Sequence, residues 1–147
     1  MIEPFVRKAM YYETDKMAVV HHSNYIRWFE EARIYYLEEH GLPFEEIEKS
    51  GLVVPVLSVD VQYRKPVRFG ETVRIREWMT KFTQLKFEIT YEVTSFETGE
   101  LLVIGKTGHC FVDEQMNPVR LKRDYKEIYD KFNEIWEIDR QWNSESE

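Results

Sequence analysis

Residues 11–25 bring together several side chains that could act on a reactive carbonyl group. Asp15 offers a carboxylate, His21 and His22 offer imidazoles, and a segment with the spacing of an amphipathic helix follows directly. A carboxylate can serve as a general base toward water or as a nucleophile, and a helix N-terminus presents unpaired N–H groups to a substrate oxygen. We therefore expect Asp15 to act on a substrate carbonyl held at the N-terminus of this helix. A structural role stays open at this point, because the helix dipole also stabilises a nearby carboxylate.

The helix that must position these groups is predicted over residues 23–40. Ser23 or Asn24 can cap its N-terminus with a side-chain oxygen, and Gly41 followed by Pro43 is a typical helix end. Apolar residues recur along it at helical spacing, namely Tyr25, Phe29, Ala32 and Tyr36.

The remaining chain predicts an α+β fold, with one antiparallel sheet of about five strands and a final helix. Apolar and polar residues alternate in the period of a half-buried strand, and a nearly continuous apolar run is typical of a central strand. Strands are expected at residues 4–12, 57–63, 73–76, 85–94 and 101–112, a short helical turn at 44–49 and a helix at 123–136. We expect a single domain over 1–147 with its core at about 5–136, and a frayed acidic tail over 137–147. A five-stranded sheet has unpaired edges that invite association, which predicts at least a dimer.

Composition excludes several classes of function. The net charge of -7 argues against nucleic acid or an anionic membrane as the main partner. No apolar run approaches the roughly 18 residues that could span a bilayer, and the acid and proline in residues 1–5 do not suit a signal peptide. The single Cys110 cannot form an internal disulfide, which fits a reducing compartment. A cytoplasmic protein without a membrane span is the expectation.

Local motifs resemble those of the hotdog-fold acyl-CoA thioesterases, in the branch of 4-hydroxybenzoyl-CoA thioesterase and the Tol-Pal-associated acyl-CoA thioesterases. The similarity runs from about residue 5 to residue 135. It rests on Tyr11-x-x-x-Asp15, Val19-Val20-x-His22-x-Asn24-Tyr25, Trp28-Phe29-Glu30 and, more weakly, the segment from Tyr63 to Glu71. The resemblance implies a sheet wrapped around one long central helix and hydrolysis of an acyl-CoA to free acid and coenzyme A. It also implies a homodimer or homotetramer with the active site at the subunit interface, and no metal or cofactor, coenzyme A being part of the substrate.

The resemblance assigns roles to three residues. Asp15 is the expected catalytic carboxylate, as general base or as nucleophile, and the backbone N–H of His22 is expected to polarise the thioester carbonyl. Tyr11 and the His22 imidazole are expected to assist. The family usually has glycine at the position of Ala18, and glycine permits positive φ and close substrate approach. We therefore expect a different loop shape or a tighter acyl pocket here.

A basic cluster interrupts the acidic chain between residues 64 and 76. Arg64, Lys65 and Arg68 are the candidates for contact with coenzyme A, whose phosphates would suit a basic patch at the pocket mouth. A solvated strand face is the alternative interpretation of the cluster. Arg74 and Arg76 continue it along the next strand.

Other functions compete with hydrolysis. A hydratase or dehydratase acting on acyl thioesters could use Asp15 with His22, and a non-catalytic acyl-CoA binding or assembly protein is a further hypothesis. A metal site at His21 and His22 is disfavoured, since no Cys or further His stands at ligand spacing. His109 is expected to be a core histidine, and Glu30 a solvated or paired carboxylate. The acyl chain preference is not predicted.

Overall fold

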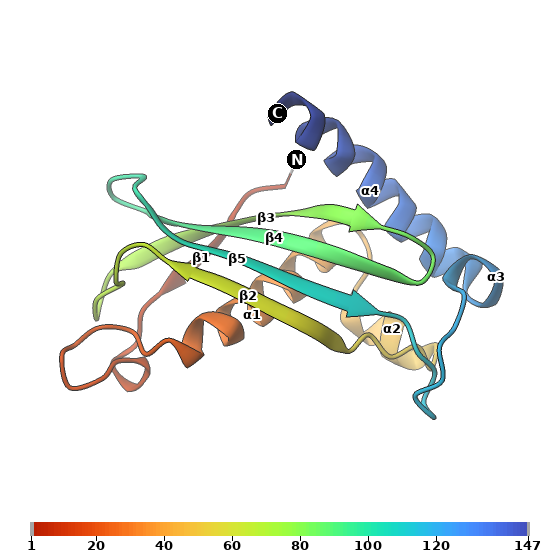
Figure 1. Ribbon diagram of the computed structural model, residues 1–147, viewed down its shortest axis with the longest axis horizontal. Coiled ribbons are helices and arrows are strands. Elements are labelled where there is room, and N and C mark those ends of the chain that lie inside the picture. Colours follow the sequence, from red (N-terminus) through yellow and green to blue (C-terminus); the bar gives the residue numbers. More distant parts are fainter. Residues whose placement is uncertain (1, 147) are drawn as a thin grey trace.

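One antiparallel sheet and one long helix form the centre of the computed structural model, which describes residues 2–146 (Figure 1). The strands lie in the order β1-β3-β4-β5-β2. They are β1 (Phe5–Lys8), β2 (Val56–Tyr63), β3 (Thr72–Phe82), β4 (Lys86–Ser95) and β5 (Leu101–Cys110). The helices are η1 (Tyr11–Glu13), α1 (Ser23–Glu39), α2 (Phe44–Lys49), α3 (Leu121–Asp124) and α4 (Lys126–Ser146). The mixed α+β class, the five strands and the long helix are confirmed, although α1 ends one residue earlier than expected.

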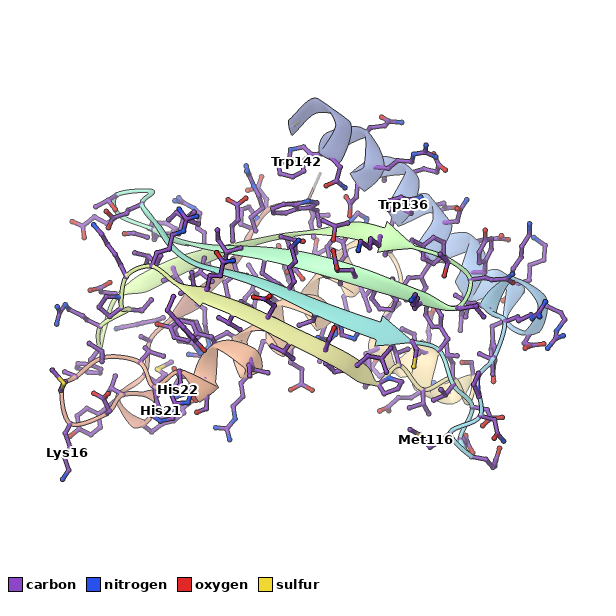
Figure 2. The ribbon with its side chains drawn as sticks, in the orientation of Figure 1. Lys16, His21, His22, Met116, Trp136 and Trp142 are labelled. Atoms are coloured by element: carbon purple, nitrogen blue, oxygen red, sulfur yellow. The ribbon has the colours of Figure 1, made fainter. Side chains whose placement is uncertain are left out.

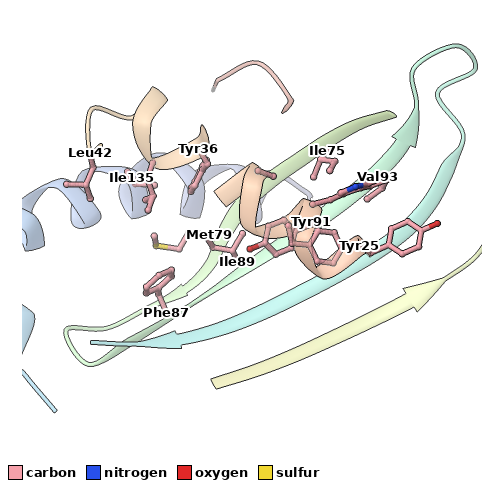
Figure 3. Close-up of a cluster of buried hydrophobic side chains, with 14 of the residues drawn as sticks. Tyr25, Tyr36, Leu42, Ile75, Met79, Phe87, Ile89, Tyr91, Val93 and Ile135 are labelled. Carbon is pink, nitrogen blue, oxygen red and sulfur yellow. The ribbon is translucent and has the colours of Figure 1, made fainter. Parts of the chain in front are cut away.

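The helix α1 packs against the inner face of the sheet through its apolar stripe. Phe29 stacks on Tyr91 of β4 with ring centroids 4.4 Å apart, and Ala32 is fully buried. A Cβ at Gly105 of β5 would lie 2.4 Å from the Phe29 ring, so only glycine allows the helix this close. Figure 3 shows the surrounding apolar side chains, to which Ile135 of α4 also contributes.

The first strand is shorter than expected, and the prediction that it ends near Tyr12 is wrong. Pairing with β3 covers Phe5 to Lys8 only. The chain then turns through η1 because the Glu13 carboxylate accepts a hydrogen bond from the Met10 N–H at 2.9 Å, and the Glu13 N–H donates to the Met10 carbonyl at 3.0 Å. This turn leads the chain away from the sheet and toward the start of α1.

The final helix is longer than expected, because residues 137–146, which were expected to be a tail, continue it. After a short α3, the helix α4 continues to Ser146, while residue 147 lies outside the described residues. Asp139 is 2% exposed. It accepts hydrogen bonds from the Met79 N–H at 2.8 Å and from the Tyr36 hydroxyl, and Asn143 donates to the Met79 carbonyl at 2.9 Å. These polar side chains hold the last turns against the sheet.

The contacts at Met79 protect one edge of the sheet. The strand β1 pairs with β3 only up to Ile75, which leaves the rest of β3 without a neighbouring strand on that side. Both main-chain polar groups of Met79 are instead paired with α4 side chains. A sheet edge covered in this way is not available for pairing with another chain.

Replacing Asp139 tests whether α4 seals this edge. We expect Asp139→Ala to lower the free energy of unfolding by about 2–4 kcal/mol, because the buried Met79 N–H and Tyr36 hydroxyl lose their partner. Denaturant unfolding measures the change. The control is Asp130→Ala on the exposed side of α4. Among residues 2–146 Asp130 pairs with Lys126 alone, at 3.3 Å, so the change should stay below about 0.5 kcal/mol. Equal stability of the two variants would contradict a sealing role for Asp139.

Candidate active site

The expected catalytic carboxylate begins a closed loop over residues 14–20. Antiparallel bridges join Thr14 to Val20 and Val19 to Arg68. The Asp15 N–H donates to the Val19 carbonyl at 2.9 Å, and the Met17 N–H donates to Asp15 Oδ1 at 2.8 Å. Within residues 2–146, Asp15 Oδ2 has no hydrogen-bond partner, and the side chain is exposed. One carboxylate oxygen is therefore held while the other can accept a proton or attack.

Ala18 adopts the backbone conformation that favours glycine. Its φ is 62°, in the left-handed region that costs an L-residue roughly 1–2 kcal/mol. The Ala18 N–H donates to the Asp15 carbonyl at 3.0 Å, and the Ala18 carbonyl accepts from the Phe69 N–H at 3.0 Å. These bonds hold Ala18 in place, so the loop keeps a glycine-type backbone despite the extra methyl group.

The helix α1 begins next to this loop without the expected side-chain cap. The cap position is His22, and its side chain makes no capping hydrogen bond. The prediction that Ser23 or Asn24 caps the helix is wrong, because the Asn24 amide donates instead to the Glu13 carbonyl at 2.8 Å. His21 Nδ1 faces the Ser23 N–H at 3.3 Å and the Ser23 hydroxyl at 2.9 Å, which agrees with a structural role for His21. In the part of the chain that the structure describes, the His22 N–H has no acceptor.

A cavity of about 260 Å³ opens at this end of α1. His22 lines it together with two of the predicted basic residues, Arg64 and Lys65, and with Val20, Tyr25, Tyr63 and Pro66. The Tyr63 hydroxyl donates to the His22 carbonyl at 3.3 Å, and the Tyr25 hydroxyl accepts from the Val67 N–H at 3.3 Å. The cavity therefore joins the helix N-terminus to the basic segment.

A separate groove of about 790 Å³ lies next to this cavity. Lys65 and Pro66 line both, and Arg68, Phe69 and Glu71 line the groove with parts of β4 and β5. Lys65 pairs with Glu100 at 2.5 Å on the surface. The structure thus brings Arg64, Lys65 and Arg68 to two neighbouring hollows that share Lys65 and Pro66.

Not every predicted residue reaches these hollows. Tyr11 is 77% exposed and packs edge-on against Phe69 at 5.6 Å, while Asp15 lies in the adjacent loop, and neither lines the cavity or the groove. Figure 2 shows Lys16, the neighbour of Asp15, at the same end of the molecule as His21 and His22. Arg74 stacks on Phe96 at 4.0 Å.

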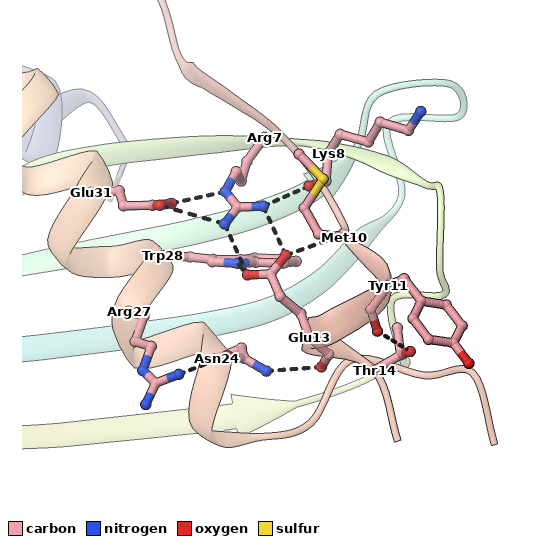
Figure 4. A network of polar contacts seen from close by, with 10 residues as sticks. All are labelled: Arg7, Lys8, Met10, Tyr11, Glu13, Thr14, Asn24, Arg27, Trp28 and Glu31. Atoms are coloured by element: carbon pink, nitrogen blue, oxygen red, sulfur yellow. Dashed lines mark hydrogen bonds and ion pairs between the residues drawn. The ribbon is translucent and has the colours of Figure 1, made fainter. Parts of the chain in front are cut away.

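Glu13, which connects the loop to the fold, was not among the predicted site residues. This carboxylate is 3% exposed. It pairs through both oxygens with Arg7 at 2.8 Å, and Oε2 also accepts from Trp28 Nε1 at 2.7 Å (Figure 4). Burial alone would raise the pKa of Glu13, but the hydrogen bonds from Trp28, Met10 and Arg7 outweigh it and hold the pKa below its usual value. No local pattern marks Glu13, because these partners come from different elements.

Two other residues behave as expected. His109 is fully buried, and its Nε2 lies 2.7 Å from the Thr107 hydroxyl. Burial, and to a lesser degree the charge of Arg33, lowers the pKa of His109 to about 3, so it is a neutral core histidine. Glu30 is exposed on α1.

The chain is similar to known thioesterases over most of its length. A model of the Thioesterase-like superfamily matches residues 11–137. The putative acyl-CoA thioesterase YneP of Bacillus subtilis is 30% identical over 125 residues, which cover 82% of this chain and 90% of that protein. The acyl-CoA thioester hydrolase YbgC of Escherichia coli is 29% identical over 101 residues, covering 65% of this chain and 75% of that protein. The solved structure of a DHNA-CoA thioesterase from Staphylococcus aureus superposes with a TM-score of 0.88 at 32% identity, covering 99% of this chain and 95% of that one. This likeness confirms the expected hotdog fold.

Substitution of Ala18 tests how tightly the loop backbone is held. We expect Ala18→Val to lower the free energy of unfolding by about 1–2 kcal/mol, because a β-branched residue is unfavourable at this φ, and to reduce activity by displacing Asp15. The matched control is Met116→Val, since Met116 has a φ of 65° in a turn at the other end of the molecule (Figure 2). Urea unfolding and thiol release measure both effects. Equal activity loss in the two variants would contradict a local effect on the loop.

Proposed function

The chain belongs to the thioesterase-like superfamily and is an acyl-CoA thioesterase, and we propose that it acts at the N-terminus of α1 with Asp15 as its catalytic carboxylate. Hydrolysis yields a free acid and coenzyme A. The observation that supports this site best is the unpaired His22 N–H at a helix start that borders a basic hollow. We assign the catalytic carboxylate to Asp15 because its loop lies beside that helix start.

The His22 N–H supplies the electrophilic part of the proposed site. Attack on a thioester places negative charge on the carbonyl oxygen. A backbone N–H at a helix N-terminus stabilises that charge, and loss of one such donor typically costs about 10²–10³-fold in rate. The absence of an acceptor for the His22 N–H among residues 2–146 supports this role, since no internal hydrogen bond would have to break when substrate binds.

Asp15 supplies the nucleophilic part in one of two ways. As a general base it takes a proton from water, the resulting hydroxide adds to the carbonyl carbon, and the C–S bond breaks to release the coenzyme A thiolate. As a nucleophile its oxygen bonds to the carbonyl carbon, the C–S bond breaks, and water then cleaves the mixed anhydride to regenerate the carboxylate. The unpaired Oδ2 suits either route. We assign Tyr11 and the His22 imidazole, both exposed near the loop, as assisting groups.

The basic residues suit the coenzyme A part of the substrate. Arg64 and Lys65 line the cavity, and Arg68 lines the neighbouring groove together with Lys65. Guanidinium and ammonium groups bind phosphate oxygens through charge-assisted hydrogen bonds, so a pyrophosphate and a 3'-phosphate would be attracted here in an otherwise acidic protein. The proposal assigns no cofactor beyond the substrate itself.

A homodimer or homotetramer formed through β2 is part of the proposal. The strand β2 pairs with β5 on one side only, and Leu57 and Val59 are 60% and 41% exposed. Whereas α4 seals the free part of β3, β2 keeps eight residues of open edge. An exposed, apolar edge of this length is a pairing surface. Pairing there would place a second subunit beside Tyr63 and the cavity.

No helix among residues 2–146 is both long and apolar enough to cross a membrane. A cytoplasmic location stays a prediction that rests on the single cysteine.

Neutralising Asp15 tests the reaction. We expect Asp15→Asn to lose at least ~100-fold in kcat, because the amide can still accept from the Met17 N–H but cannot act as base or nucleophile. Thiol release over a panel of aliphatic and aromatic acyl-CoAs measures it. The control is Asp113→Asn, since Asp113 accepts from two turn N–H groups at 2.9 Å in the same manner. Retained turnover in Asp15→Asn, or hydration of an enoyl-CoA in place of thiol release, would refute the mechanism.

Removing charge from the groove tests coenzyme A binding. We expect Lys65→Ala and Arg68→Ala each to raise KM for an acyl-CoA about tenfold, equivalent to roughly 1.4 kcal/mol, with kcat little changed. The KM for an acyl-pantetheine, which lacks the nucleotide, should not move. Arg76→Ala is the control, because Arg76 stacks on Trp142 at 5.5 Å and lines neither hollow. Parallel KM changes for both substrates would contradict nucleotide contact.

A further inference from the structure

We propose that Glu13 is a positioning residue that holds Asp15 and the first-turn amides of α1 in a fixed relation. The inference rests on the proposed function, and Glu13 itself is not assigned to touch substrate. Its side chain bonds β1 and α1 at the start of the loop, and its backbone carbonyl accepts hydrogen bonds from the start of α1. Figure 4 shows the side-chain contacts of Glu13 and the bond from Asn24 to its carbonyl.

The Glu13 side chain is fixed by hydrogen bonds from three residues. Oε1 accepts from Arg7 Nη1 at 2.8 Å and from the Met10 N–H at 2.9 Å. Oε2 accepts from Arg7 Nη2 at 2.8 Å and from Trp28 Nε1 at 2.7 Å. Since both oxygens of a nearly fully buried carboxylate are engaged in this way, the side chain has one geometry.

Arg7 is itself locked in place. Its Nε donates to Glu31 at 2.8 Å, and its guanidinium lies 5.4 Å from the centroid of the Trp28 ring. Arg7 comes from β1 and Trp28 from α1. Glu13 is therefore bonded to two rigid elements at once.

The backbone carbonyl of Glu13 makes the second connection. It accepts from the His21 N–H at 2.8 Å and from Asn24 Nδ2 at 2.8 Å. His21 directly precedes the proposed carbonyl-polarising N–H of His22, and Asn24 lies in the first turn of α1. One peptide group thus fixes the helix start relative to the loop.

Asp15 cannot move independently of this anchor. Only Thr14 separates it from Glu13, and the Thr14 N–H and hydroxyl both donate to the Tyr11 carbonyl, at 3.1 and 2.7 Å. A misplacement of about 1 Å in a catalytic group can cost up to about 100-fold in rate. The network around Glu13 is therefore expected to act on kcat through Asp15.

Glutamine cannot replace Glu13 in this network. Every group facing the two oxygens is a donor, and the glutamine NH₂ is also a donor. Whichever way the amide points, it places N–H against N–H on one side. The side chain must then move, and the loop start moves with it.

Glu13→Gln is the test, with Glu31→Gln as its matched control. Glu31 bonds the same Arg7 but contacts neither η1 nor the loop. Assayed by thiol release at an equal interval below each Tm, Glu13→Gln should lower kcat about 10–100-fold with KM within about threefold. Glu31→Gln should leave kcat within about twofold.

A double-mutant cycle separates positioning from general stability. If Glu13 acts through Asp15, Glu13→Gln should cost at least about threefold less when added to Asp15→Asn than it does in the wild type, because one of the two groups that it positions is already gone. Should Glu13→Gln fail to fold, Asn24→Ala serves in its place, since it removes the other connection to the same peptide group and is expected to give the same non-additive loss.

The outcomes distinguish this inference from the proposed function. An unchanged kcat in Glu13→Gln, or an equal loss in the wild-type and Asp15→Asn backgrounds, overturns the positioning role while leaving the mechanism intact. Full activity of Asp15→Asn overturns the mechanism and the positioning role with it.

Discussion

The buried ion pair between Arg7 and Glu13 is the interaction on which the site depends. A carboxylate that is 3% exposed must be paired, and its donors come from β1, from Met10 just before η1, and from α1. Satisfying them ends the first strand at Lys8, forms η1 and brings the loop to the helix start. Removing one partner of a buried pair typically costs about 3–5 kcal/mol, so this arrangement is held firmly.

The same rule, that buried polar groups must be paired, explains the two sheet edges. At β3 the α4 side chains Asp139 and Asn143 bond the main chain of Met79. At β2 no strand within residues 2–146 pairs with the outer edge. The difference between a sealed edge and an open one is what directs the proposed subunit pairing to β2, next to the cavity. The covered edge of β3 and the proposed pairing at β2 thus follow from one constraint.

Much of the site could be predicted because its residues lie close together in the chain. Asp15 and His22 are seven residues apart, in one loop and the helix start that follows it. Arg64, Lys65 and Arg68 lie in one turn segment. Local motifs were therefore sufficient to place each set of residues in a group. The structure joins the two groups through bonds such as that between the Phe69 N–H and the Ala18 carbonyl at 3.0 Å. The identity of Ala18 signalled a departure, but its positive φ required the folded loop.

The sequence by itself determined the class of fold, the position of α1 and the residue types at the site, since hydrophobic period and local motifs are properties of neighbouring residues. Only the tertiary structure decided the roles of Glu13, Asn24 and Asp139. Their polar side chains are typical of turns, caps and surfaces, and no apolar pattern includes them. Each is buried because its hydrogen-bond partners arrive from distant elements: Trp28 is 15 positions from Glu13, and Met79 is 60 positions from Asp139. A buried polar group is specified by partners that meet only once the chain has folded.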